Sequence, residues 1–137
     1  MNILIVEDDF SSRKLLTCFL RNHGTCDVAI NGIEAVEAVK RSLEDNNPYD
    51  LICLDIMMPE MDGFEALRQI RDFEKSRDLW GSDGVKVIMV TAKSMPRDII
   101  SAFNAGCEAY IVKPIDRDAL FREIENLGLH VEALPKT

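Results

Sequence analysis

The chain has 137 residues, of which 47% are hydrophobic and 29% are charged, and this composition excludes intrinsic disorder and fibrous structure. Its length corresponds to one domain, which can bury enough apolar surface to fold without disulfides or structural metals. The 16 basic and 24 acidic residues give a net charge of −8, which disfavours direct binding to nucleic acid or to anionic membranes.

We find neither a metal-binding cysteine pattern nor a membrane span. None of the four cysteines lies in a CxxC pair or at zinc-ligand spacing from a histidine. Cys18 lies on an amphipathic stretch and Cys53 in an apolar run, so we expect buried free thiols in a reducing compartment. The apolar runs are far shorter than the ~20 residues of a membrane span, and the N-terminus turns acidic where a signal peptide would be apolar. These features predict a cytoplasmic location.

Five short apolar runs alternate with longer stretches of helical period along the chain. The runs are 3–6, 26–30, 51–54, 85–90 and 109–112. The stripes at helical spacing that follow them are Leu15, Leu16, Phe19 and Leu20; Ile33, Val36, Ala38, Val39 and Leu43; Phe64, Leu67, Ile70 and Phe73; Ile99, Ile100, Phe103 and Ala105; and Leu120, Phe121, Ile124 and Leu127. This alternation predicts one α/β domain, a parallel sheet with helices on both faces.

Two segments depart from this pattern. Glu74–Gly84 is expected to be a long polar connection, and it holds the only tryptophan, Trp80. Trp80 is interpreted as covering the domain's own surface, with anchoring of a partner as the alternative. Residues 129–137 have little pattern and are expected to form a C-terminal tail after a domain of residues 1–128.

Charged and hydroxyl residues stand where the predicted strands end, which is where ligands bind to open parallel sheets. Glu7 and Asp8 follow the first strand, Asp55 the third, Thr91 the fourth and Lys113 the fifth. Two carboxylates ~4 Å apart repel by about 4 kcal/mol at an effective dielectric of ~20, so this cluster favours a hard divalent cation. Oxygen ligands without a histidine or cysteine cluster indicate Mg²⁺ rather than zinc, with room for phosphate oxygens. Lys113 and Thr91 are suited to contact a phosphoryl group.

Each of these residues also has an ordinary structural interpretation. Asp8 could cap a helix, Asp55 could form a turn, Thr91 could be a loop hydroxyl and Lys113 a surface lysine. Only their joint occurrence at four strand ends indicates a functional site.

Four motifs occur in the order ILIVEDD (3–9), LDIMMPEMDG (54–63), VTA (90–92) and YIVKP (110–114). With them the sequence resembles the receiver domain of two-component response regulators, in the manner of single-domain chemotaxis regulators, over residues 2–128. The resemblance implies a flavodoxin-like, doubly wound α/β fold. In that fold a five-stranded parallel sheet of strand order 2-1-3-4-5 is flanked by five helices.

The resemblance also implies the metal-dependent part of the site. Asp55 corresponds to the phosphoacceptor aspartate of the family. Asp8 corresponds to the direct ligand of Mg²⁺ (or Mn²⁺), Glu7 acts on the metal mainly through water, and the backbone carbonyl of Met57 corresponds to a third protein ligand. The implied reaction transfers a phosphoryl group from a phosphohistidine of a sensor kinase or phosphotransfer protein to Asp55.

The remaining implied roles concern the response to phosphorylation. Thr91 and Lys113 correspond to the residues that hold the phosphoryl group, and Tyr110 to the switch aromatic that follows Thr91. A cis Lys113–Pro114 bond is implied as well. The surface of the fourth helix, fifth strand and fifth helix would then change and engage a downstream protein, as a monomer or as a phosphorylation-dependent dimer. Met57 and Lys93 carry neither a carboxylate nor an amide that could orient water, which predicts a long-lived phosphorylated form.

Other interpretations remain open at this stage. A phosphatase of the haloacid dehalogenase type would need a second aspartate where Met57 stands, and a flavodoxin-like cofactor carrier would need a Gly/Ser/Thr-rich loop after Val6. A receiver fold that docks without phosphorylation is the main alternative. In the preferred interpretation the chain is not an enzyme but a phosphoacceptor that assists its own modification. It is either a stand-alone regulator or a part of a larger one.

Overall fold

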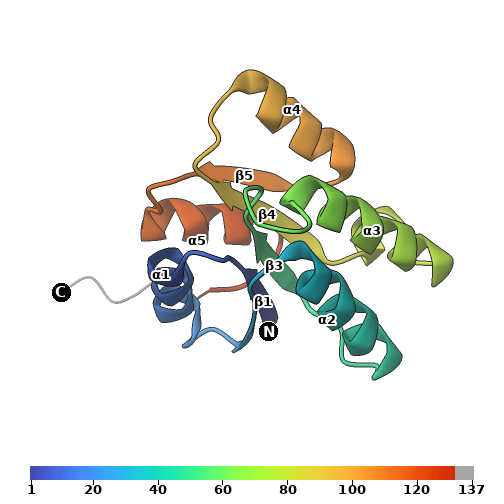
Figure 1. Cartoon of the computed structure of the whole chain (residues 1–137). Coiled ribbons are helices and arrows are strands. Elements are labelled where there is room, and N and C mark those ends of the chain that lie inside the picture. Colours follow the sequence, from blue (N-terminus) through green and yellow to red (C-terminus); the bar gives the residue numbers. More distant parts are fainter. Residues whose placement is uncertain (132–137) are drawn as a thin grey trace.

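The computed structural model describes residues 1–131, and within them five parallel strands form one sheet in the order β2-β1-β3-β4-β5 (Figure 1). The strands are β1 (Asn2–Val6), β2 (Thr25–Ala29), β3 (Leu51–Leu54), β4 (Lys86–Thr91) and β5 (Ala109–Val112). The helices are α1 (Phe10–Leu20), α2 (Gly32–Glu44), α3 (Gly63–Ser76), α4 (Pro96–Ala105) and α5 (Arg117–Asn126), with a 3₁₀ turn, η1, at Gly81–Asp83. The predicted fold class and strand order are confirmed.

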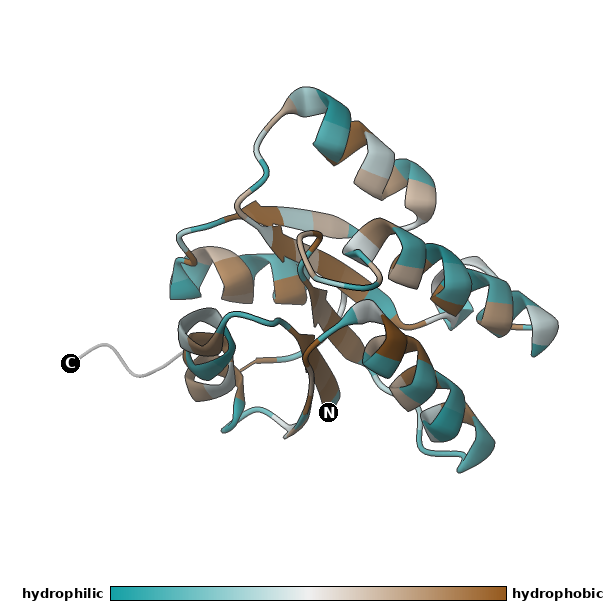
Figure 2. Cartoon of the chain, in the orientation of Figure 1, coloured by the Kyte–Doolittle hydropathy of each residue, from teal (hydrophilic) through white to brown (hydrophobic). Residues whose placement is uncertain are grey.

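Helices cover both faces of the sheet and enclose two hydrophobic layers. In Figure 2 the strands are mostly brown, whereas the helices carry both teal and brown segments. Leu4 and Val6 of β1 point toward the layer beneath α2, α3 and α4, and Ile3 and Ile5 point toward α1 and α5. Burying each such side chain stabilises the fold by about 1.5–3 kcal/mol, which is why these runs become strands covered on both sides.

Short polar side chains and one glycine set the ends of the helices. Asp9, Asn31, Asp62 and Asp116 are N-caps, and each accepts a hydrogen bond from the backbone N–H three residues further on. Gly106 ends α4 in the left-handed conformation with a φ of 111°, which a residue with a side chain rarely adopts. The Lys113–Pro114 peptide bond is cis, as the resemblance implied.

Three predicted helical stripes contain exposed residues, and in α2 the exposed one is Ile33, at 44%. α4 packs against α3 and the edge strand β5, and Ala102 is its one fully buried residue. Ile100 and Phe103, expected to face the core, are 59% and 46% exposed. In α1, Leu16 is buried, but Leu15 is 39% exposed. A helix beside a sheet edge has a narrow contact, so apolar spacing overestimates what it can bury.

The expectation of buried thiols is wrong for one cysteine. All four cysteines are free, and Cys53 and Cys107 are buried, which raises the pKa of each thiol to about 12. Cys26 is half-buried, whereas Cys18 is exposed because it lies on the outer face of α1.

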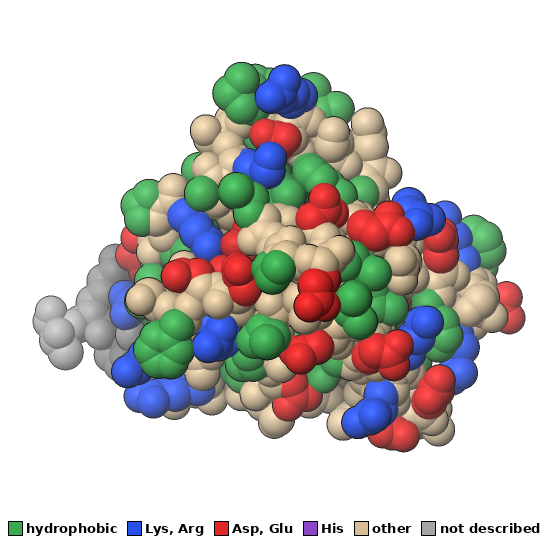
Figure 3. All heavy atoms as spheres, viewed as in Figure 1, with side chains coloured by type: hydrophobic (Ala, Val, Ile, Leu, Met, Phe, Trp, Pro, Cys, Tyr) green, Lys and Arg blue, Asp and Glu red, His purple; other side chains and the backbone are tan. Residues whose placement is uncertain are grey.

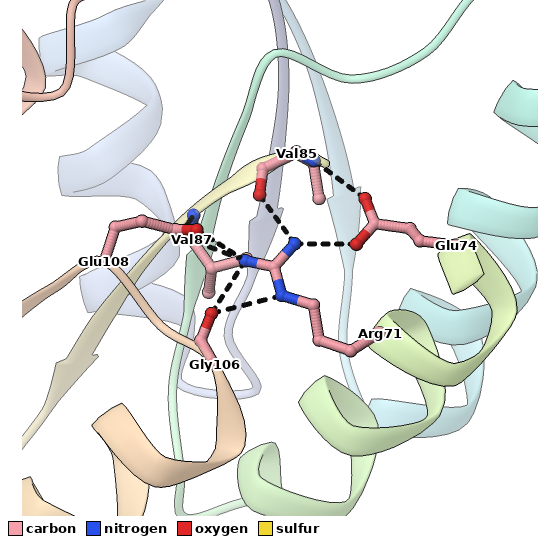
Figure 4. Close-up of polar contacts among 6 residues, drawn as sticks. All are labelled: Arg71, Glu74, Val85, Val87, Gly106 and Glu108. Carbon is pink, nitrogen blue, oxygen red and sulfur yellow. Dashed lines mark hydrogen bonds and ion pairs between the residues drawn. The ribbon is translucent and has the colours of Figure 1, made fainter. Parts of the chain in front are cut away.

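The expected polar connection Glu74–Gly84 starts later than predicted, because α3 continues to Ser76. Glu74 is buried on α3 and accepts hydrogen bonds from Arg71 Nη1 (2.7 Å) and from the backbone N–H of Val85 (2.7 Å) (Figure 4). Trp80 is 58% exposed and lies under the ammonium group of Lys75, 5.8 Å from the ring centre.

The chain stays packed on the domain for a few residues after α5. Leu129 contacts the layer beneath α1 and α5, and Val131 is buried and donates its N–H to Glu125 Oε1 at 3.0 Å. The rest of the expected tail, residues 132–137, lies outside the described residues. Across residues 1–131, no helix combines the length and apolar character needed to span a membrane.

Candidate functional site

The carboxyl ends of four strands bring the predicted site residues to one edge of the sheet. Glu7 and Asp8 follow β1, Asp55 follows β3, Thr91 ends β4 and Lys113 follows β5. Because β1, β3 and β4 are neighbours in the sheet, residues distant in sequence lie side by side. Acidic side chains gather across the middle of this face of the molecule (Figure 3).

Three carboxylates form the acidic part of the site. One oxygen from each of Glu7, Asp8 and Asp55 lies within 4.8 Å of the other two. Glu7 is 1% exposed and Asp55 is 5% exposed, whereas Asp8 is exposed to solvent. Two buried carboxylates at this separation repel each other strongly unless a cation or a proton offsets their charge.

Lys113 supplies one such cation. Its ammonium group donates to Glu7 Oε2 at 2.7 Å and to Asp55 Oδ2 at 3.2 Å. Burial lowers the pKa of Lys113, but the hydrogen bond to Glu7 and the charge of Asp55 outweigh this effect and raise it above its ordinary value. Lys113 therefore stays charged and bridges the β1 and β3 ends of the site.

The surroundings of Glu7 perturb the pKa of its carboxyl group. Burial raises its pKa to about 7, the neighbouring charge of Asp55 adds to this effect, and the hydrogen bond from Lys113 opposes it. Both of its oxygens are engaged, Oε2 by Lys113 and Oε1 by the backbone N–H of Asp9 at 3.1 Å. Glu7 is thus held in place by the protein rather than free to turn toward a ligand.

Asp8 differs from Glu7 because its carboxylate has no hydrogen-bond partner among residues 1–131. The helix-capping role that Asp8 could have taken falls instead to Asp9, whose Oδ2 accepts from the N–H of Ser12 at 2.9 Å. The Asp8 carboxylate is therefore available to a ligand from solvent.

The β3–α3 loop holds Asp55 from the other side. The backbone N–H of Met57 donates to Asp55 Oδ1 at 3.2 Å, so each oxygen of Asp55 has one partner. Gly63 donates its N–H to the carbonyl of Ile56 at 2.9 Å, and a Cβ on Gly63 would lie 2.2 Å from the Asp55 carbonyl oxygen. A side chain at residue 63 would push the start of α3 away and loosen this loop.

Thr91 ends β4 and Tyr110 lies on the neighbouring strand β5, and among the bonds within residues 1–131 none joins their side chains. Thr91 is buried, and its Oγ1 accepts from the N–H of Lys93 at 3.4 Å. The Tyr110 hydroxyl is half-buried and donates to the carbonyl of Lys93 at 2.8 Å. The loop after β4 thus connects to both residues that the resemblance named as the switch.

The donor set suits a hard divalent cation. The ligand atoms available are carboxylate oxygens, and the three acids and Lys113 carry a net charge of −2 when all are ionised. Mg²⁺ and Mn²⁺ prefer such oxygen ligands together with water and phosphate oxygens. A hollow of about 420 Å³ opens beside the site and is lined in part by Asp8, Met57, Phe64 and Lys93. The Met57 carbonyl as a metal ligand stays a prediction.

One residue close to the site was missed by the sequence analysis. The sequence analysis assigned no role to Arg13 of α1, but its Nη1 donates to the carbonyl oxygen of Glu7 at 3.1 Å. No spacing pattern in the sequence indicates this contact, because it depends on how far the guanidinium reaches.

Comparisons with known proteins agree with this arrangement. The sequence pattern of the response regulator receiver domain matches residues 3–125. The transcriptional regulatory protein ResD of Bacillus subtilis is 40% identical over 122 residues, which are 88% of this chain and 45% of that protein. The chain spans about half or less of the length of the first curated relatives that it matches.

Two solved structures share both the fold and a related sequence. A chain of the CheX-CheY-BeF3-Mg²⁺ complex from Borrelia burgdorferi has a TM-score of 0.80 and 30% identity, covering 95% of this chain and 90% of that one. A chain of the Saccharomyces cerevisiae complex between Ypd1 and the receiver domain of Ssk1 has a TM-score of 0.79 and 34% identity, covering 93% and 88%. The chain belongs to the response regulator receiver domain family of two-component signalling.

Proposed function

We propose that the chain is a phosphorylation-controlled switch that accepts a phosphoryl group on Asp55. The observation that carries this proposal is the contact of Lys113 with Asp55 Oδ2 beside two further carboxylates. A buried carboxylate with a fixed cation at one oxygen is positioned for attack on phosphorus. The donor would be a phosphohistidine of a sensor histidine kinase or of a phosphotransfer protein, in line with the Ypd1–Ssk1 neighbour.

In the transfer step an oxygen of Asp55 forms a bond to phosphorus while the bond from phosphorus to the histidine nitrogen breaks. The departing imidazole keeps the electron pair and takes up a proton from solvent. The protein contributes position and charge rather than covalent chemistry. Lys113 would offset negative charge on the phosphoryl oxygens, and Thr91, which ends the neighbouring strand β4, would donate its hydroxyl to them.

Asp8 and Asp55 would hold the metal ion, Mg²⁺ or Mn²⁺, with the Met57 carbonyl as a third ligand and Glu7 acting through water. When bound, the metal offsets charge on the carboxylates and the phosphoryl oxygens. The exposed carboxylate of Asp8, which has no hydrogen-bond partner within residues 1–131 and lies beside two buried acids, supports this assignment. The presence of Mg²⁺ in the Borrelia burgdorferi complex supports it as well.

The output would run through Thr91 and Tyr110. A phosphoryl group that draws the Thr91 hydroxyl toward Asp55 leaves space for the Tyr110 ring to turn, which releases its bond to the Lys93 carbonyl. The face formed by α4, β5 and α5 then changes and engages a downstream protein. The weak packing of α4, which buries only Ala102, supports its response to small shifts in the preceding loop. The long phosphoform lifetime expected from Met57 and Lys93 stays a prediction.

The proposal is tested by treating the full chain with acetyl phosphate and Mg²⁺ and measuring its intact mass. We expect one added phosphoryl group, located at Asp55 by peptide mapping, and complete loss of the addition in Asp55→Asn. Asp62→Asn is a matched control, because Asp62 lines the same hollow and asparagine caps a helix as well as aspartate. An unmodified wild-type chain, or a modification that survives Asp55→Asn, would favour a receiver fold that docks without phosphorylation.

A further inference from the structure

A single side chain of α1 holds the loop that carries two of the three acids. Arg13 Nη1 donates to the carbonyl oxygen of Glu7 at 3.1 Å and to that of Asp8 at 3.4 Å. These carbonyls lie where the chain has left β1. We propose that Arg13 is a positioning residue, which fixes the backbone of Asp8 so that its carboxylate is presented to the metal ion. This inference rests on the proposed metal-dependent function.

The other residues of this loop have anchors of their own. Glu7 donates its N–H to the Ala29 carbonyl at 3.0 Å, and its side chain is held by Lys113. Asp9 donates its N–H to Glu7 Oε1 and caps α1 through Ser12. Asp8 lies between these two fixed residues and is exposed.

Arg13 therefore provides the bond that decides how Asp8 is oriented. The carbonyl of Glu7 belongs to the peptide group before Asp8, and the carbonyl of Asp8 belongs to the one after it. Holding both carbonyls on one guanidinium nitrogen fixes the two peptide planes that flank Asp8. The direction of its side chain follows from these planes. Freeing the backbone of one residue weakens binding by roughly tenfold, so the loss of Arg13 should weaken Mg²⁺ binding by a measurable amount.

The positive charge of Arg13 would weaken metal binding, which is opposite to the effect of its positioning role. No ion pair joins Arg13 to a carboxylate within residues 1–131, so its guanidinium does not neutralise the acids directly. A positive charge near the site repels an incoming dication, and its removal strengthens metal binding if charge alone matters. If Arg13 acts by positioning Asp8, its removal weakens metal binding instead. The sign of the change in metal affinity therefore separates the charge effect from the positioning effect.

Lys14 offers a matched control on the same helix. The ammonium group of Lys14 lies 5.9 Å from the centre of the Phe10 ring, and the guanidinium of Arg13 lies 5.5 Å from it. Lys14 is exposed and has no hydrogen bond to the β1–α1 loop within residues 1–131. Lys14→Met and Arg13→Met remove the same charge and a contact with the same ring, but only the second releases the loop.

The test is a calorimetric titration of the full chain with Mg²⁺. We expect Arg13→Met to bind about three- to tenfold more weakly than wild type. Lys14→Met should bind equally or slightly more tightly, and Arg13→Lys should recover part of the loss because it restores a donor. Amide hydrogen exchange without metal gives a second readout, in which Arg13→Met speeds exchange at Glu7 and Asp9 while the urea midpoint stays unchanged.

The inference would be overturned if Arg13→Met bound Mg²⁺ as tightly as Lys14→Met does and exchanged its loop amides at the wild-type rate. Failure of the proposed function has a different signature. In that case wild type binds no Mg²⁺, or binds it as well after Asp55→Asn, and the exchange rates of the loop still decide whether Arg13 fixes its backbone.

Discussion

Each end of the sheet places one cation between two carboxylates, and the two clusters are built differently. At the amino ends of β4 and β5, Arg71 lies between Glu74 and Glu108 (Figure 4). At the carboxyl ends, Lys113 lies between Glu7 and Asp55. Both clusters are largely buried, so burial and ion pairing alone do not separate a functional site from a structural one.

The difference lies in how completely the polar groups are satisfied. Arg71 also donates to the Val85 carbonyl at 2.8 Å and to the Gly106 carbonyl at 2.8 and 3.1 Å, so all its N–H groups have partners. Both of its carboxylates accept a backbone N–H in addition. The Lys113 cluster has excess negative charge, and beside it lies the exposed Asp8, whose carboxylate has no hydrogen-bond partner in the described part of the chain, residues 1–131. A closed network can only support the fold, whereas an open one can take up a ligand.

The largest expected effect comes from opening the closed network. Arg71→Met leaves Glu74 and Glu108 buried without their cation, and breaking a buried pair in this way costs about 3–5 kcal/mol of unfolding free energy. Urea denaturation followed by circular dichroism measures the change.

Arg68→Met is the matched control on α3. Arg68 pairs with Glu65 and Asp72 on the exposed face of the helix, where such pairs contribute about 0–1 kcal/mol. Equal losses for Arg68→Met and Arg71→Met would mean that the buried network does not support the fold.

The site was easier to predict from sequence than this network. Parallel strands must bring their carboxyl ends to one edge, so apolar runs alone were enough to place Glu7, Asp55 and Lys113 together. Every residue of that cluster directly follows a strand, and its position depends on strand order rather than on side-chain detail.

Glu74 and Arg13 could not be placed in the same way. Glu74 stands four residues after Ile70 on the buried side of α3, but a carboxylate there looked like the start of a polar loop because its partners, Arg71 and the Val85 N–H, belong to tertiary structure. Arg13 depends on where its guanidinium reaches, which no spacing rule contains. Both misses concern long side chains that bond to backbone atoms.

Titration of Glu7 makes the stability of the domain depend on pH. The pKa of Glu7 rises from 4.5 to about 7 in the folded chain, so the folded state binds a proton that the unfolded state has lost. The stabilisation is fully present below pH 4.5 and is lost as pH rises through about 7, by about 3 kcal/mol at most. Urea midpoints measured with a chelator present should fall over this window.

Glu7→Gln keeps an oxygen for Lys113 but cannot titrate, so its stability should fall much less between pH 4.5 and 7. Glu108, whose pKa is also raised by burial, titrates in both proteins and cancels from the comparison. Parallel pH profiles for wild type and Glu7→Gln would contradict the assignment.

The smallest expected changes in stability have opposite signs at the two ends of the sheet. Glu74→Gln presents an amide N–H₂ to one of two donors, Arg71 or the Val85 N–H, and should lose about 1–3 kcal/mol of unfolding free energy.

Asp8→Asn removes one like charge beside Asp55 and breaks no hydrogen bond of its side chain within residues 1–131. In chelator it should therefore gain about 0.5–1 kcal/mol of unfolding free energy. Mg²⁺ should reverse the order of Asp8→Asn and wild type, because only the wild type gains from the metal. Two losses, or two gains, would show that the two ends of the sheet obey the same rule.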